Sequence, residues 1–196
     1  MSRIIDRGAI TAAYVGIGMA VTIGVSFLLV IPIEPIYWLL ALPAGMLIGY
    51  YANQRSDRRA GPWSRILANA IFAGLVTALT LAALLLAVKA LFFFADNGYP
   101  NFNRVDEAGS PTPPFCDSGA GCVYARYLAD GRGPDFASAG ITDAASFTGY
   151  YWSQQFTTAR TLVLLTTVGG LIGGLGYGFT RPKSQSPASP PESAGA

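Results

Sequence analysis

The feature that most constrains the fold of this chain is a set of four long apolar stretches with almost no charge. They run over residues 8–31, 36–52, 66–88 and 161–180. Each has at least about 17 residues, close to the roughly 20 that a helix needs to cross a hydrocarbon core about 30 Å thick. The sequence therefore predicts an all-α membrane protein whose core is a four-helix transmembrane bundle.

Composition and charge distribution agree with this prediction. Apolar residues make up 52% of the chain and charged residues 12%, about half the charged share of a soluble domain. The N-terminal segment, the loop 53–65 and the C-terminal tail hold eight Lys or Arg against three Asp or Glu, whereas the other connecting segments hold five against eight. The positive-inside rule then places both termini and the loop in the cytoplasm. We expect a multi-pass protein of the bacterial inner membrane.

The chain divides into four parts on this interpretation. Residues 1–95 hold the first three helices, and residues 96–160 are too long for an idle connector, so we expect them to form a small extracytoplasmic cap between helices three and four. The fourth helix occupies residues 161–181. Residues 182–196, mostly Ser, Pro, Ala and Gly, are predicted to be a disordered cytoplasmic tail.

Helices are also expected outside the apolar stretches. The third is predicted to continue to residue 94, and a matching extension over 144–160, capped by Thr142, is predicted to precede the fourth. Within the cap, apolar residues around 123–128 follow the spacing of a short amphipathic helix. Four residues are expected to pack beneath that helix: Phe136, Ile141, Phe147 and Tyr151.

Cys116 and Cys122 are the only cysteines, and both lie in the predicted cap. An even count in an oxidising outer compartment favours a structural disulfide. Closing a loop of about seven residues contributes about 2.4 kcal/mol in the chain-entropy model. A thiol–disulfide exchange pair is the alternative, but redox motifs typically use a tighter Cys-x-x-Cys spacing at a helix N-terminus. We therefore interpret the pair as a staple for the cap.

Glycine recurs at four-residue steps in two of the predicted helices, as Gly45-xxx-Gly49 and as Gly170-xxx-Gly174-xxx-Gly178. Missing side chains let helix backbones approach closely, which favours association in lipid. The pattern predicts close helix contact. It leaves open whether that contact lies within the bundle or whether the Gly170 face docks a partner helix or a second copy of the chain.

Three ionisable residues lie near the predicted outer boundary, namely Glu34, Lys89 and Arg160. Lys89 and Arg160 are expected to extend their charged ends to the lipid headgroups. Alternatively, one of them pairs with Glu34 and holds the cap over the bundle. The apolar stretches contain no Asp or Glu, although buried charges usually mark the pathway of an ion-coupled transporter.

These residues favour an interaction protein over an enzyme. The chain has no histidine, which excludes a His-ligated haem, a His-based triad and a histidine proton relay. No catalytic residue, cofactor or metal site is predicted, and no nucleic-acid partner. We expect an assembly factor, accessory subunit or scaffold that binds a membrane protein or its own copies through glycine-rich helix faces and the external cap.

Two other interpretations remain. An oligomeric channel or transporter component for a small solute would need a polar lumen built by Asn69 and the threonines of the bundle. A membrane thiol oxidoreductase would rest on the cysteine pair alone. The large external segment before the last helix is similar in topology to tetraspanins, although the Cys-Cys-Gly motif of that family is absent.

Overall fold

The computed structural model describes residues 5–26, 34–57, 61–95, 108–110 and 113–181, with the backbone alone over 34–38. The first part of the predicted cap, 96–107, and the predicted disordered tail, 182–196, therefore lie outside the described residues. The described part of the chain is helical and contains no strand.

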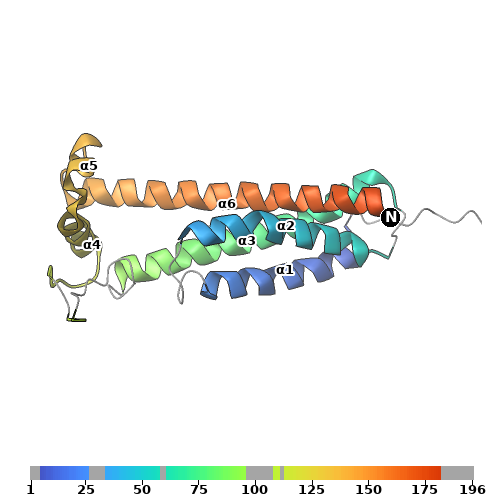
Figure 1. Ribbon diagram of the computed structural model, residues 1–196, viewed down its shortest axis with the longest axis horizontal. Helices are drawn as coiled ribbons and strands as arrows, with labels where there is room; N and C mark the ends of the chain where they lie inside the picture. Colours follow the sequence, from blue (N-terminus) through green and yellow to red (C-terminus); the bar gives the residue numbers. More distant parts are fainter. Residues whose placement is uncertain (1–4, 27–33, 58–60, 96–107, 111–112, 182–196) are drawn as a thin grey trace, which may run out of the picture.

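Four helices lie side by side as a bundle (Figure 1). They are α1 (Arg7–Val25), α2 (Glu34–Gln54), α3 (Trp63–Phe94) and α6 (Ala144–Thr180). Two short helices, α4 (Ala120–Tyr127) and α5 (Gly133–Ser138), are joined by a π-helical turn, η2 (Leu128–Arg132), and lie across one end of α6 (Figure 1). The start of α1 and the end of α6 lie together at the opposite end of the bundle.

The bundle helices differ in length, and this difference creates the cap. At 1.5 Å per residue, the 37 residues of α6 span about 55 Å, and the 32 residues of α3 span about 48 Å. The described parts of α1 and α2 have 19 and 21 residues, about 30 Å. Both α3 and α6 thus extend beyond α1 and α2 and carry α4 and α5 at their tips (Figure 1).

Three helices are long and apolar enough to cross a membrane within the described residues, namely α1, α3 and α6. They correspond to the first, third and fourth of the predicted spans, although the last residues of the first predicted span, 27–31, lie outside the described residues. The second predicted span forms the helix α2, which is not among these three.

The predicted extensions of α3 and α6 are confirmed, since α3 reaches Phe94 and α6 is one continuous helix from Ala144. The predicted N-cap residue of this helix, Thr142, is wrong by one position. The N-cap is Asp143, whose carboxylate accepts a hydrogen bond from the Ser146 amide at 2.7 Å, while the Ser146 hydroxyl accepts one from the Asp143 amide at 3.2 Å. This reciprocal capping box satisfies two amides at the start of the helix. The Asp143 carboxylate forms it in place of the Thr142 hydroxyl.

Glycines form the contact between α2 and α6. A Cβ atom on Gly45 would lie 2.1 Å from the backbone oxygen of Thr166, and one on Gly49 would lie 2.1 Å from that of Gly170. From the other side, a Cβ on Gly173 would lie 2.0 Å from the Met46 oxygen. At each of these positions a glycine of one helix lies against the backbone of the other, and this close approach is what small residues permit in membrane bundles.

The glycine steps of α6 also face α3. A Cβ on Gly170 would lie 3.0 Å from the Ala70 oxygen, one on Gly174 2.5 Å from the Ala70 Cβ, and one on Gly178 2.3 Å from the Trp63 ring. The glycine pattern thus packs the bundle within the chain. In this structure α2 and α3 cover the Gly170 face, so the docking of a partner helix or a second copy there stays a prediction without support from this contact.

Candidate functional site

The cap, by which we mean α4, η2, α5 and the residues around them over 113–143, has a hydrophobic core of its own. Six residues from four helices and the α5–α6 turn are buried in one cluster: Phe93, Val123, Phe136, Ile141, Phe147 and Tyr151. The ring of Phe93 stacks on that of Tyr151, with centroids 4.7 Å apart. The prediction that four of these residues pack beneath a short amphipathic helix is confirmed, and the core fixes the cap onto the tips of α3 and α6.

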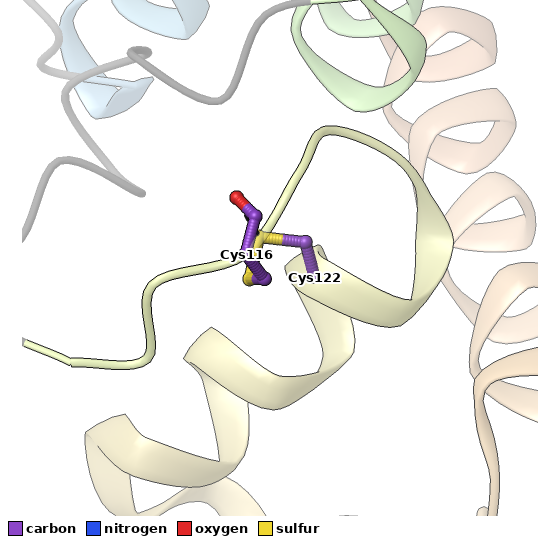
Figure 2. The surroundings of a disulfide bond; sticks show 2 residues. All are labelled: Cys116 and Cys122. Atoms are coloured by element: carbon purple, nitrogen blue, oxygen red, sulfur yellow. Dashed lines mark hydrogen bonds between the residues drawn. A yellow bond between two sulfur atoms is a disulfide. The ribbon is translucent and has the colours of Figure 1, made fainter.

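The predicted disulfide between Cys116 and Cys122 is present in the structure (Figure 2). It ties the segment before α4 to the first turn of that helix, and the Cys122 side chain is buried. Gly119, within the closed loop, has a φ of 113°, a conformation that L side chains rarely adopt. The staple therefore holds the approach to α4 in a fixed turn beside the aromatic core.

A pocket of about 200 Å³ opens between the cap and the first turns of α6. Its inner wall consists of buried rings: Phe136, Phe147 and Tyr151. The side chains around this wall are Tyr127, Arg132, Tyr150, Gln154 and Gln155. The rings of Phe136 and Phe147 lie 5.4 Å apart, and that of Tyr127 lies 5.5 Å from Phe147. The pocket thus combines a rigid aromatic wall with amide, hydroxyl and guanidinium groups.

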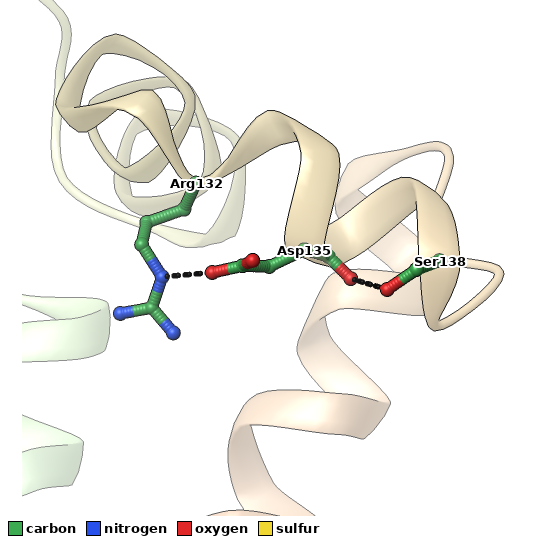
Figure 3. Close-up of polar contacts among 3 residues, drawn as sticks. All are labelled: Arg132, Asp135 and Ser138. Atoms are coloured by element: carbon green, nitrogen blue, oxygen red, sulfur yellow. Dashed lines mark hydrogen bonds and ion pairs between the residues drawn. The ribbon is translucent and has the colours of Figure 1, made fainter.

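Arg132 is held at this pocket by its neighbours. Gly131 has a φ of 81°, which reverses the chain between α4 and α5 immediately before Arg132. The Arg132 Nε donates to Asp135 Oδ2 at 3.0 Å, and the Ser138 hydroxyl donates to the Asp135 backbone oxygen at 2.8 Å (Figure 3). The Arg132 and Asp135 side chains are 49% and 68% exposed, so the pair contributes little to stability. Its effect is to orient the guanidinium, whose two terminal nitrogens point away from Asp135 (Figure 3).

Asp143, the N-cap residue of α6, has a lowered pKa. Hydrogen bonds from the backbone amide and then from the hydroxyl of Ser146 hold the pKa of Asp143 below its ordinary value of 3.8. The carboxylate is therefore ionised at neutral pH, where it also interacts favourably with the positive end of the α6 dipole.

A second polar cluster lies at the opposite end of the bundle. Asp6 caps α1 through the Ala9 amide and also accepts hydrogen bonds from the Asn69 side chain, at 3.1 Å, and from the Ser56 hydroxyl. Asn69 is fully buried, and its oxygen accepts from the Asp6 amide at 3.3 Å. Asn69, named above only as a possible lumen residue, thus joins α3 to the residue that caps α1, and its acidic partner Asp6 was not predicted. The signal available in the sequence was an Asp at an N-cap position next to an apolar stretch.

The three predicted outer ionisable residues do not share one environment. Lys89 is only 4% exposed, so its side chain packs among neighbouring residues near the end of α3 that carries the cap and does not extend outward as expected. Arg160 is exposed, and the expectation that its charged end reaches the headgroups stays a prediction. The side chain of Glu34 lies outside the described residues, and with it the predicted pairing.

The described residues contain no group of three or more His, Cys, Asp or Glu side chains placed to hold a metal ion. Comparisons of the chain with protein-family models, with curated proteins and with solved structures give no match.

Proposed function

We propose that this chain is a four-span protein of a bacterial cell membrane, with both termini in the cytoplasm, and that it acts as a non-catalytic interaction protein through its external cap. On this proposal it is an assembly factor, accessory subunit or scaffold. The observation that carries the proposal is the cap itself: an ordered, disulfide-bonded unit with its own aromatic core, raised on the two longest helices.

The number of crossings is supported by parity. If α1, α3 and α6 alone crossed the membrane, the two ends of the chain would lie on opposite sides. The start of α1 and the end of α6 lie at the same end of the bundle (Figure 1), so a fourth crossing is needed. The helix α2 has 21 residues and packs against α1, α3 and α6, which makes it the segment suited to return the chain.

The orientation is supported by the charges at the two ends. Arg7, Arg55, Arg65 and Arg181 lie at or near the ends of the bundle helices on the side away from the cap. Basic residues next to membrane helices favour the cytoplasmic side. The cap then faces the oxidising outer compartment, where a disulfide persists.

The cap offers exposed apolar side chains that a partner could cover. Phe115, next to the disulfide, is 74% exposed, and Leu128 in η2 is 40% exposed. The cap stands beyond the helices α1 and α2, where lipid tails do not cover such groups, so a partner protein is the occupant that this proposal assigns to them. The glycine faces of α2 and α6, in contrast, are used within the chain.

The experiment is site-specific photo-crosslinking in intact cells. A benzoylphenylalanine replaces Phe115 or Leu128 in the cap, and the matched control replaces Leu79, which is 53% exposed in the middle of α3. We expect the cap positions to crosslink one protein of defined mass and the control to label lipid. Equal protein crosslinking from Leu79, or none from either cap position, would contradict the proposal.

The topology is tested separately by labelling single cysteines with a membrane-impermeant maleimide. Cysteine in place of Ser110, on the cap side, should react in intact cells. Cysteine in place of Ser186, in the C-terminal tail, should react only after the membrane is opened. The reverse pattern would refute the orientation.

The channel alternative finds less support in this geometry. Asn69 is bonded to Asp6, and the Thr77 hydroxyl donates to the Ala73 backbone oxygen at 2.9 Å. Both groups are fully buried within one chain and so do not present a shared polar lumen.

A further inference from the structure

We propose that the cap pocket binds a phosphate ester group carried on an apolar molecule. The ester group would occupy the side of the pocket at Arg132, Gln154 and Gln155, and the apolar part would lie on the aromatic wall. The same chemistry is found in a phospholipid headgroup and in a small soluble phosphate ester.

The size of the pocket sets the first limit on its ligand. Its volume of about 200 Å³ is below the roughly 300–1,000 Å³ of sites for drug-sized molecules. A headgroup with the adjoining carbon atoms fits such a space, whereas a whole lipid does not. The wall is preformed, because Phe136, Phe147 and Tyr151 belong to the buried core that fixes the cap to α6.

The polar groups set the second limit. Arg132 is the one cationic residue among those that line the pocket, and no Asp or Glu lines it. Asp135 engages only Nε, and the structure gives the two terminal nitrogens of Arg132 no bond to another described residue. Arginine presents such donors in a planar fork that matches phosphate oxygens. The side-chain amides of Gln154 and Gln155 supply neutral donors beside it.

The depth of the pocket relative to the membrane sets the third limit on the ligand, and this limit rests on the proposed function. The apolar stretch 161–180 of α6 covers the hydrocarbon core, about 30 Å. Gln155 lies six residues before that stretch, about 9 Å further out along the same helix, which is the level of the headgroups. Exposed Phe94 and Phe156, with Trp152 between them, lie nearby on α3 and α6, as in the aromatic belts of membrane interfaces.

The test uses the purified full-length protein in detergent. Native mass spectrometry measures binding of dioctanoyl phosphatidylglycerol, with dioctanoylglycerol as the matched lipid that lacks phosphate. Calorimetric titration with glycerol 1-phosphate measures the soluble source. Each probe is applied to the natural chain, to Arg132→Gln, to Gln155→Ala and to the control Arg160→Gln, which removes the same charge from an exposed site on α6 outside the pocket.

We expect saturable binding of one phosphatidylglycerol and weak binding of dioctanoylglycerol. Losing hydrogen bonds to a charged group costs about 1.5–3 kcal/mol, so Arg132→Gln should weaken binding about tenfold or more, with a smaller loss for Gln155→Ala and none for Arg160→Gln. Binding of glycerol 1-phosphate with the same dependence on Arg132 would assign the soluble source as well.

Three results would overturn the inference. The first is an equal loss of phosphatidylglycerol binding in Arg132→Gln and Arg160→Gln, which would indicate general attraction between charges. The second is equal binding of dioctanoyl phosphatidylglycerol and dioctanoylglycerol. The third is no binding of any probe. Because Arg132 is half-exposed, its replacement leaves the cap core intact, and an unchanged unfolding temperature verifies this. Crosslinking from Phe115 in the Arg132→Gln variant reports on the proposed protein partner independently, so failure of one proposal is distinguishable from failure of the other.

Discussion

The glycine contact between α2 and α6 gives a quantitative prediction through two substitutions on one helix. In Gly173→Ala the new Cβ would lie 2.0 Å from the backbone oxygen of Met46. In Gly176→Ala the new Cβ would meet no atom within 4 Å. Both variants replace glycine by alanine within α6, three residues apart. They differ only in whether the added methyl group points at α2.

The magnitude follows from that distance. Ordinary contact for a Cβ begins at 3.4 Å, so the backbones at Gly173 must separate by about 1.4 Å, the difference between this contact distance and the distance that the added Cβ would have. A backbone carbonyl cannot move aside as a flexible side chain does, and overpacking of this kind costs about 1–3 kcal/mol. Each variant gains the same helix propensity, about 1 kcal/mol, which cancels in the comparison. We expect Gly173→Ala to be less stable than Gly176→Ala by about 1–3 kcal/mol.

The assay is thermal unfolding of the purified full-length variants in one detergent, followed by circular dichroism. At about 2–4 °C per kcal/mol for a chain of this size, the midpoints should differ by several degrees. Equal midpoints would refute the assignment of the glycine contact to the interior of the bundle. Equal midpoints together with a loss of oligomer in Gly173→Ala would show instead that the contact lies between two chains.

Three further predictions concern the cap and the polar cluster. Cys116→Ser should lower the stability of the cap by about 2 kcal/mol in the chain-entropy model, measured by amide hydrogen exchange in α4, with membrane insertion retained; loss of insertion would contradict a local staple. Hydrogen bonds from Ser146 lower the pKa of Asp143, so the Asp143 carboxylate stabilises the start of α6 above about pH 4, and this stabilisation is lost as the pH falls through the lower folded-state pKa. Protection of the Ser146 amide against hydrogen exchange should follow this pH dependence. If the same pH dependence persists in Asp143→Asn, Asp143 is not its source. Asn69→Leu removes hydrogen bonds to Asp6 in a buried site and should cost about 1–3 kcal/mol; an unfolding temperature equal to that of the natural chain would show that the cluster does not join α1 to α3.

Much of the architecture was predictable because it depends on local patterns. Long uncharged runs predicted helices suited to a membrane, and three of them are confirmed as candidate spans. The spacing of apolar residues around 123–128 predicted α4 and the rings beneath it. The cysteine pair predicted its own disulfide, since two cysteines allow one intramolecular bond. Each of these predictions depends on residues that lie close together in the sequence.

Other features required the packed structure. The glycine pattern predicted contact but not its location, because a missing side chain fits any backbone of suitable shape; the positions of α2 and α3 decided it. Lys89 follows an apolar stretch and was expected at the headgroups, yet the length of α3 and its packing bury it. The bond between Asp6 and Asn69 joins residues 63 positions apart, a separation for which the sequence carries no spacing rule.

The sequence by itself determined that this chain forms apolar helices, that one end carries more basic charge, and that its longest connecting segment can fold with a disulfide. Each of these follows from side-chain hydrophobicity, charge or count, which are properties of single residues or short runs. Only the tertiary structure decided that Arg132, Phe136, Tyr150 and Gln155 share one pocket. These residues come from a turn and two helices, and their distances depend on the crossing of α5 over α6 and on the reversal at Gly131. A pocket is a property of relative orientation, and long-range packing sets that orientation.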